Sequence, residues 1–78
     1  DFYLSMTSYC NGSSDTILID IQKQLINNFD SIYSGPNSDL IISDKDRLPD
    51  NCHFSTIGLK KFAKLWVESL ILKSDYTK

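Results

Sequence analysis

The spacing of apolar residues changes from every second residue to every third or fourth within the first half of the chain. Phe2, Leu4 and Met6 alternate with other side chains, which predicts a β-strand over residues 2–8. Further along, apolar residues recur at helical spacing, which predicts an amphipathic helix over residues 15–30. A strand that leads directly into a helix restricts the chain to folds that combine the two.

The second half of the chain repeats this order. The apolar run Leu40-Ile41-Ile42, bounded by turn residues, predicts a strand over residues 39–43 that is buried on both faces. A polar loop containing Pro49 follows, and renewed helical spacing then predicts a helix over residues 56–72. Strands that alternate with helices indicate a parallel sheet covered by helices, so the predicted fold class is α/β.

Cap and turn residues set the ends of these elements. Ser13 or Ser14 is the predicted N-cap of the first helix, and Ser55 or Thr56 that of the second. The tripeptide Gly35-Pro36-Asn37 is predicted to form the turn that ends the first helical stretch.

The size of the chain limits what it can do alone. A chain of 78 residues buries only about 60–65% of the surface that its unfolded form exposes, and two strands do not make a stable open sheet. We therefore expect residues 1–78 to be the C-terminal β-α-β-loop-α portion of a larger α/β domain. The formal charge of −2 does not favour nucleic acid, and no apolar run approaches the roughly 18 residues of a membrane span.

One loop carries residue types suited to chemistry. Asp50-Asn51-Cys52-His53 lies between the second predicted strand and the last helix, and functional groups in parallel sheets collect on loops past the carboxyl ends of strands. An Asp three residues before a His can turn its carboxylate back onto the imidazole, fix its tautomer and stabilise the imidazolium. The alternative is a loop histidine with an incidental acidic neighbour.

The two cysteines bear on the same loop. Cys10 and Cys52 each follow a predicted strand, and a right-handed parallel crossover places both at one end of the sheet. A disulfide is therefore feasible, and two unpaired thiols are the alternative.

The sequence does not favour a metal site. Cys10, Cys52 and His53 make only three of the four ligands that a zinc site needs. Asp44-x-Asp46 lacks the other ligands of a calcium loop, which favours a solvated acidic turn.

The Asp-x-x-His loop is followed by residues whose types and spacing form a longer pattern with it, namely Phe54, Ser55, Gly58-Leu59, Ala63, Trp66 and Leu70. Together with Asp50 and His53 they resemble the C-terminal block of the SGNH (GDSL-type) serine hydrolase superfamily. In that superfamily the motif supplies two members of a Ser-His-Asp triad. The resemblance implies that Asp50 and His53 are catalytic, and that the chain is part of a flavodoxin-like three-layer α/β/α domain.

Within this superfamily, the chain is most similar to sialate O-acetylesterases and related carbohydrate acetylesterases. Their C-terminal part shows a strand ending near a Cys, a Gln on a helix, a Gly-Pro-Asn/Asp turn and an Arg before the Asp. The corresponding positions are Tyr3–Cys10, Gln22, Gly35-Pro36-Asn37 and Arg47. The resemblance therefore implies an esterase acting on an acylated small molecule or carbohydrate, without metal or organic cofactor.

The nucleophile Ser and the oxyanion-hole Gly and Asn of the superfamily have no counterpart here, and Ser13 and Ser14 stand in the wrong context. The partner that the resemblance implies is the remainder of the hydrolase domain, with the Ser on an upstream segment. The fragment alone is expected to be inactive. The alternatives are a non-catalytic interaction module and a degenerate homologue that lost its nucleophile.

Overall fold

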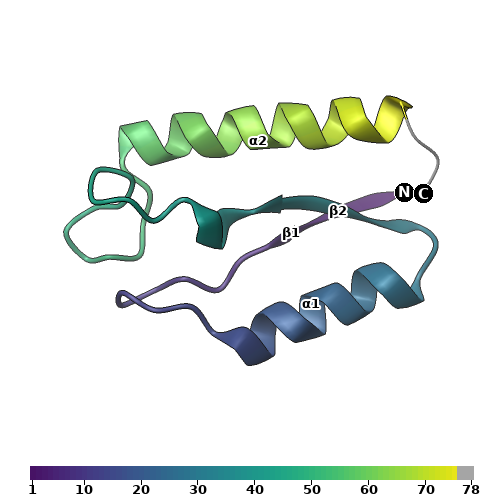
Figure 1. Ribbon diagram of the computed structural model, residues 1–78, viewed down its shortest axis with the longest axis horizontal. Helices are drawn as coiled ribbons and strands as arrows, with labels where there is room; N and C mark the ends of the chain where they lie inside the picture. Colours follow the sequence, from purple (N-terminus) through teal and green to yellow (C-terminus); the bar gives the residue numbers. More distant parts are fainter. Residues whose placement is uncertain (76–78) are drawn as a thin grey trace.

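The computed structural model describes residues 1–75 and shows a small α/β unit. Its elements are strand β1 (Phe2–Met6), helix α1 (Thr16–Asn28), strand β2 (Ile32–Asn37), the 3₁₀ turn η1 (Ser38–Leu40) and helix α2 (Thr56–Asp75). The sheet lies between the two helices, and the long loops gather at the end of the molecule opposite the N-terminus (Figure 1). Over the described residues, the helices are too short or too polar to cross a membrane.

Strands β1 and β2 pair in parallel, which confirms the predicted strand direction. The register joins Phe2 to Ile32 and Met6 to Asn37, with one irregularity between these two pairs. Because both strands run the same way, their carboxyl ends meet at one edge of the sheet. This edge is the end at which the loops gather (Figure 1).

The predicted strand over residues 39–43 is wrong, because the second strand is Ile32–Asn37. In the apolar run that suggested it, Ile41 is buried, with 4% of its surface exposed, whereas Leu40 is 75% and Ile42 48% exposed. Only the middle residue of the run is therefore buried, whereas the predicted strand would bury side chains on both of its faces. The first predicted strand and both predicted helices are present, and their ends differ from the prediction by at most three residues.

A short turn takes the place of the predicted strand because two polar side chains bind backbone groups there. Asn37 caps η1 by accepting the N–H of Asp39 at 2.9 Å. The carboxylate of Asp39, which is only 9% exposed, accepts the N–H groups of Ser8 and Tyr9, each at 2.8 Å. These bonds tie the segment after β1 to the segment after β2.

Gly35-Pro36-Asn37 belongs to β2, so the turn predicted there is also wrong. A Cβ atom at Gly35 would lie 2.8 Å from the ring of Trp66 and 3.1 Å from the backbone of Leu4. Glycine at this position therefore allows α2 to approach the sheet closely. Pro36 has no N–H to donate, which suits a strand at the edge of a sheet.

Helix α1 has Asp15 as its N-cap, in place of the predicted Ser13 or Ser14. The Asp15 carboxylate accepts the N–H groups of Ile17 and Leu18 at 3.0 and 3.1 Å. A carboxylate in this position satisfies free amides of the first turn and also interacts favourably with the helix dipole.

The apolar stripe of α1 is only partly covered by the sheet. Leu18, Ile21 and Leu25 remain 40, 50 and 39% exposed. The polar Gln22 instead joins the helix to the segment after β1, since its side chain accepts the Thr7 N–H at 2.9 Å and donates to the Thr7 carbonyl at 3.0 Å. Hydrogen bonds therefore hold α1 in place beside a limited apolar contact.

Helix α2 begins with the predicted Ser55 cap, whose hydroxyl accepts the N–H of Gly58 at 3.1 Å. A Cβ atom at Gly58 would lie 2.0 Å from the carbonyl oxygen of Asp46. Glycine in the first turn of α2 thus permits direct contact between the helix and the loop that precedes it. The contact joins the first turn of α2 to Asp46, at the start of that loop.

Candidate active site

The loop over residues 46–55 folds back on itself like a hairpin. Arg47 and Phe54 form an antiparallel bridge, and the Leu48 N–H donates to the His53 carbonyl at 2.8 Å. At the tip, the Asn51 N–H donates to the Leu48 carbonyl at 2.9 Å, and Asn51 adopts a φ of 56°. Asparagine tolerates this left-handed conformation better than most residues. The Asp-x-x-His motif occupies this tip.

Asp50 binds both the backbone of the tip and the imidazole of His53. Its Oδ1 accepts the N–H groups of Cys52 and His53 at 2.9 and 3.1 Å. Its Oδ2 lies 2.5 Å from His53 Nδ1. The two side chains predicted from their spacing are therefore in contact, with 46% of Asp50 and 76% of His53 exposed.

Hydrogen bonds favour the ionised form of the Asp50 carboxyl. The bond from the His53 side chain, together with that from the Cys52 amide, lowers the pKa of Asp50 below its usual range. Asp50 is therefore ionised at neutral pH, and its Oδ2 accepts a hydrogen bond from the Nδ1–H of His53. In the neutral ring, a hydrogen on Nδ1 leaves the lone pair on Nε2, and the His53 side chain is largely exposed. An imidazole held in this tautomer can accept a proton and later return it.

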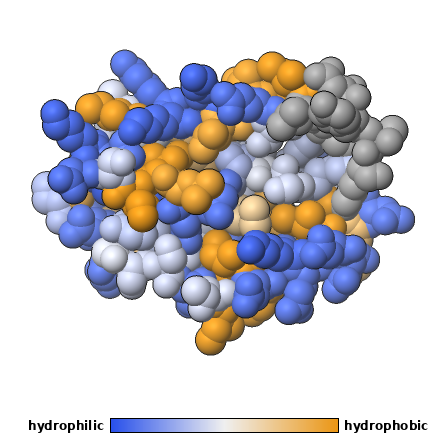
Figure 2. Space-filling view, in the orientation of Figure 1, coloured by the Kyte–Doolittle hydropathy of each residue, from blue (hydrophilic) through white to orange (hydrophobic). Residues whose placement is uncertain are grey.

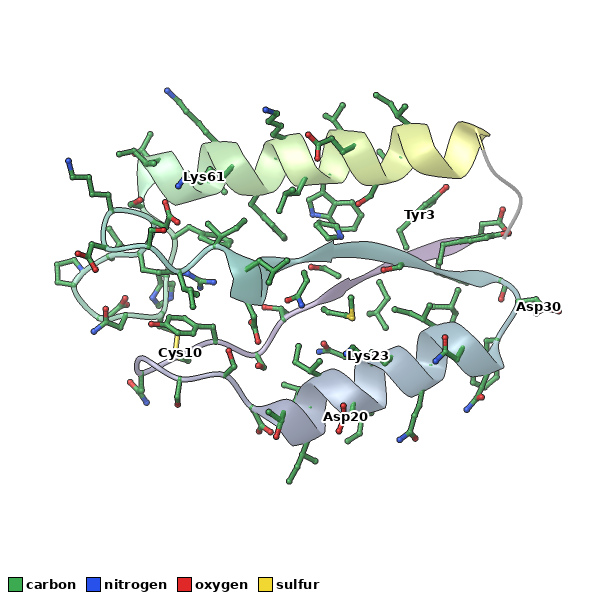
Figure 3. The ribbon with its side chains drawn as sticks, viewed as in Figure 1. Tyr3, Cys10, Asp20, Lys23, Asp30 and Lys61 are labelled. Atoms are coloured by element: carbon green, nitrogen blue, oxygen red, sulfur yellow. A yellow bond between two sulfur atoms is a disulfide. The ribbon has the colours of Figure 1, made fainter. Side chains whose placement is uncertain are left out.

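A disulfide joins the tip of this loop to the segment after β1. Cys10 and Cys52 are bonded, with their Cα atoms 4.1 Å apart and a separation of 42 positions in sequence. Figure 3 shows Cys10 at the loop end of the molecule. Their predicted proximity is confirmed, and the structure selects the bond over two free thiols. The misplaced second strand did not affect this prediction because β2 leads to the same edge.

A tight hairpin presents Cys10 to the loop. Cys10 and Ser13 exchange two backbone hydrogen bonds of 3.0 and 3.1 Å around Asn11 and Gly12, whose φ values are 52° and 79°. Two consecutive positive φ angles define a type I′ turn, for which Asn-Gly is the preferred sequence. The Gly12 N–H also donates to the Asn51 carbonyl at 3.2 Å. A covalent bond and a hydrogen bond therefore hold the tip in place.

The base of the loop is held by an ion pair. Asp46 is 2% exposed, and its carboxylate lies 2.7 Å from Lys61 Nζ and accepts the Ser43 N–H at 3.1 Å. The solvated acidic turn predicted there is wrong for Asp46. The hydrogen bond from Lys61 lowers the pKa of Asp46 below its usual range. Figure 3 shows Lys61 reaching from α2 toward this loop.

Two residues that organise this edge were not identified as site residues from the sequence. Burial raises the pKa of Asp39, but hydrogen bonds from Ser8 and Tyr9 outweigh burial, so this pKa lies below its usual range. No local pattern marks Asp39 as a buried residue. In the sequence, Arg47 is marked only by the family resemblance. Arg47 is also the single arginine of the chain, and this feature could have indicated a specific role for its side chain.

The described residues do not place a nucleophile beside His53. Within residues 1–75, no serine hydroxyl is hydrogen-bonded to its ring, and those of Ser8 and Ser55 bind Asp39 and the Lys45 carbonyl instead. In the same range, no group of three or more His, Cys, Asp or Glu residues converges on a possible metal position.

Comparison of the chain with protein-family models, curated proteins and solved structures gave no match.

The chemistry available at the carboxyl edge of the sheet follows from its geometry. It consists of an ionised carboxylate, an imidazole oriented by it, and a loop tip held by a disulfide. These parts are suited to general acid–base catalysis.

Proposed function

We propose that this chain supplies the Asp and the His of a Ser-His-Asp triad in a carboxylic ester hydrolase, with O-acetylated carbohydrate as the substrate class. The observation that carries the proposal is the 2.5 Å contact between Asp50 Oδ2 and His53 Nδ1, at the carboxyl edge of a parallel sheet. The resemblance of residues 50–70 to the SGNH hydrolase block supports the choice of reaction and substrate.

Each residue of the pair has a defined role in this reaction. His53 Nε2 takes the proton of the serine hydroxyl as the serine oxygen attacks the ester carbonyl. The same proton passes to the leaving alcohol, which leaves an acyl-enzyme that water hydrolyses with His53 again as the base. Asp50 stays ionised throughout and stabilises the imidazolium, which agrees with its lowered pKa.

The serine and the oxyanion hole are proposed to lie outside residues 1–78, on a segment that joins this unit. A two-stranded sheet needs further strands to be stable, and the same segment is proposed to supply them. Apolar side chains also reach the surface over both helices (Figure 2). Residues 1–78 by themselves are therefore expected to show no ester hydrolysis.

The exposed apolar surface also favours a second candidate, a non-catalytic interaction module. Ile17, Leu59 and Val67 are 72, 57 and 56% exposed. These side chains lie on both helices, and exposed apolar side chains of this kind favour a protein partner that covers them. In this case the Asp50–His53 contact only stabilises the loop, as it also would in a degenerate homologue without a nucleophile.

Hydrolysis of p-nitrophenyl acetate by the complete protein separates these candidates, together with labelling by a fluorophosphonate that reacts with activated serines. His53→Ala should lower kcat by about 10³-fold or more and abolish labelling, because a triad acts as a unit. Asp44→Asn, at an exposed position of the neighbouring loop, should leave both signals unchanged. Hydrolysis by His53→Ala at the wild-type rate would exclude the triad. Absence of labelling in the wild type would favour the interaction module.

A further inference from the structure

Arg47 connects the three segments that meet at the carboxyl edge of the sheet. Its Nε donates to the Ile41 carbonyl at 2.9 Å, its Nη2 to the Ser38 carbonyl at 2.8 Å and its Nη1 to the Cys52 carbonyl at 2.5 Å. The first two acceptors follow β2, and the third lies beside His53. Among the described residues, no carboxylate forms an ion pair with this guanidinium.

Two aromatic rings hold the same guanidinium. Its carbon lies 4.2 Å from the centre of the Phe54 ring and 4.8 Å from that of Tyr9. Phe54 directly follows His53, and Tyr9 directly precedes the disulfide-bonded Cys10. Such cation–π contacts add attraction and also fix the plane of the guanidinium. The planar fork is thereby oriented toward its three carbonyl groups.

The contact with Cys52 matters most, because the carbonyl of Cys52 and the N–H of His53 belong to one peptide group. Arg47 binds the carbonyl of this peptide, and Asp50 Oδ1 accepts its N–H at 3.1 Å. Both ends of the peptide plane are therefore fixed. Rotation of the plane would move the N–H away from Asp50 and change the direction in which the Cα–Cβ bond of His53 points.

We propose that Arg47 is the positioning residue of the Asp50–His53 pair. It orients the peptide before His53 and does not touch the reacting atoms. The structural half of this inference stands on the geometry alone, and its kinetic half rests on the proposed esterase function. Lysine cannot replace Arg47, because a single ammonium group does not match three carbonyl groups arranged around a planar fork.

The test compares Arg47→Lys and Arg47→Met with Lys45→Met, which removes an exposed cation from the same loop. The first readout is the pKa of the Asp50 carboxyl, measured by carbon-detected NMR with far-UV circular dichroism as the check of folding. We expect this pKa to rise toward its usual value in both Arg47 variants and to stay low in Lys45→Met. An unchanged pKa in folded Arg47→Lys would overturn the proposal.

The second readout is kinetic and is made on the complete protein. A small displacement of a general base costs about 10²-fold in rate, so Arg47→Lys should lower kcat by about 10- to 100-fold while KM stays within about twofold. A change in KM alone would overturn the positioning role. If no protein shows hydrolysis, the proposed function fails, and the Asp50 readout still decides the structural half.

A measurement on the wild-type protein covers the case in which both Arg47 variants fail to fold. The Nε–H of Arg47 donates to the Ile41 carbonyl at 2.9 Å and should give a sharp NMR signal that exchanges slowly with solvent. Exchange as fast as that of an exposed arginine would show that the fork is not bound, and would overturn the proposal.

Discussion

The loop end of the molecule and its sheet–helix body are stabilised in different ways. At the loop end, a disulfide, the Asp46–Lys61 ion pair and the three hydrogen bonds of Arg47 link neighbouring segments. In the body, several apolar side chains of both helices are about half exposed, such as Ile21 at 50% and Leu59 at 57%. Among the described residues, the buried hydrophobic side chain is Ile41, which lies in the segment after β2. The Asp50–His53 pair is thus placed by polar and covalent links more than by a core.

The difference has a physical cause. An apolar core requires several layers of side chains, and one helix on each face of a two-stranded sheet supplies few of them. A disulfide or a charged hydrogen bond needs only its two partners, so it can form within a short loop. The geometry of the pair should therefore respond strongly to changes at the loop end and weakly to changes in the body.

The largest effect is expected for Asp50→Asn. Its amide can still accept the Cys52 and His53 N–H groups, but it favours the wrong tautomer of the ring, so kcat for ester hydrolysis in the complete protein should fall by about 10²- to 10⁴-fold. The matched control in the body is Asp15→Asn, which likewise caps two amides and should change kcat less than about twofold. Equal losses from both variants would remove the distinction between the two regions.

Removing the disulfide should have the next largest effect on stability. The bond closes a loop of 42 residues, so the double variant Cys10→Ser/Cys52→Ser should lose about 4 kcal/mol of unfolding free energy by the chain-entropy relation. Urea titration measures this loss. In the double variant, the Gly12 amide should exchange with solvent faster than the amides of β1. Uniform opening of both would mean that the loop end is not a separate unit.

Gly58→Ala tests the contact between α2 and the base of the loop. The added Cβ would meet the Asp46 carbonyl oxygen at 2.0 Å, so the backbone must shift, and we expect a loss of about 1–3 kcal/mol. Lys60→Ala, at an exposed position of the same helix, should stay within about 0.5 kcal/mol of the wild type. A stability of Gly58→Ala equal to that of Lys60→Ala would contradict the contact.

Acid should weaken the loop end before the body. The pKa values of Asp39, Asp46 and Asp50 are lowered in the folded protein, so their stabilisation is complete above the ordinary value of 3.8 and is lost as the pH falls through and below it. Two-dimensional NMR over this pH range should show the amides of Ser8 and Tyr9 changing before those of α1. Simultaneous change throughout the chain would contradict this order.

The smallest effect is expected in the body. Ile21 is 50% exposed on α1, so Ile21→Gln should change the unfolding free energy of residues 1–78 by no more than about 0.5 kcal/mol. Urea titration measures the difference. In the complete protein the same change should cost more if another segment covers this stripe, and an equal cost in both would argue that nothing covers it.

Local features of the sequence predicted much of the candidate site. The Asp-x-x-His spacing places a carboxylate within reach of the imidazole because a turn of this length brings both to one side of the tip. The cap at Ser55 likewise depends only on its neighbours in sequence. The hydrogen-bond partners of Arg47 were not predictable, because Ser38 and Ile41 become its neighbours only after the segments meet.

The sequence by itself determined both helices, the first strand and the pairing of Asp50 with His53, because periodicity, capping and short turns involve residues close in the chain. Tertiary structure alone decided where β2 lies and that Cys10 bonds to Cys52. It also decided that the acidic residues 39 and 46 are buried. In each of these cases the deciding partner is distant in sequence or is a backbone group, and backbone groups leave no mark in a pattern of side chains.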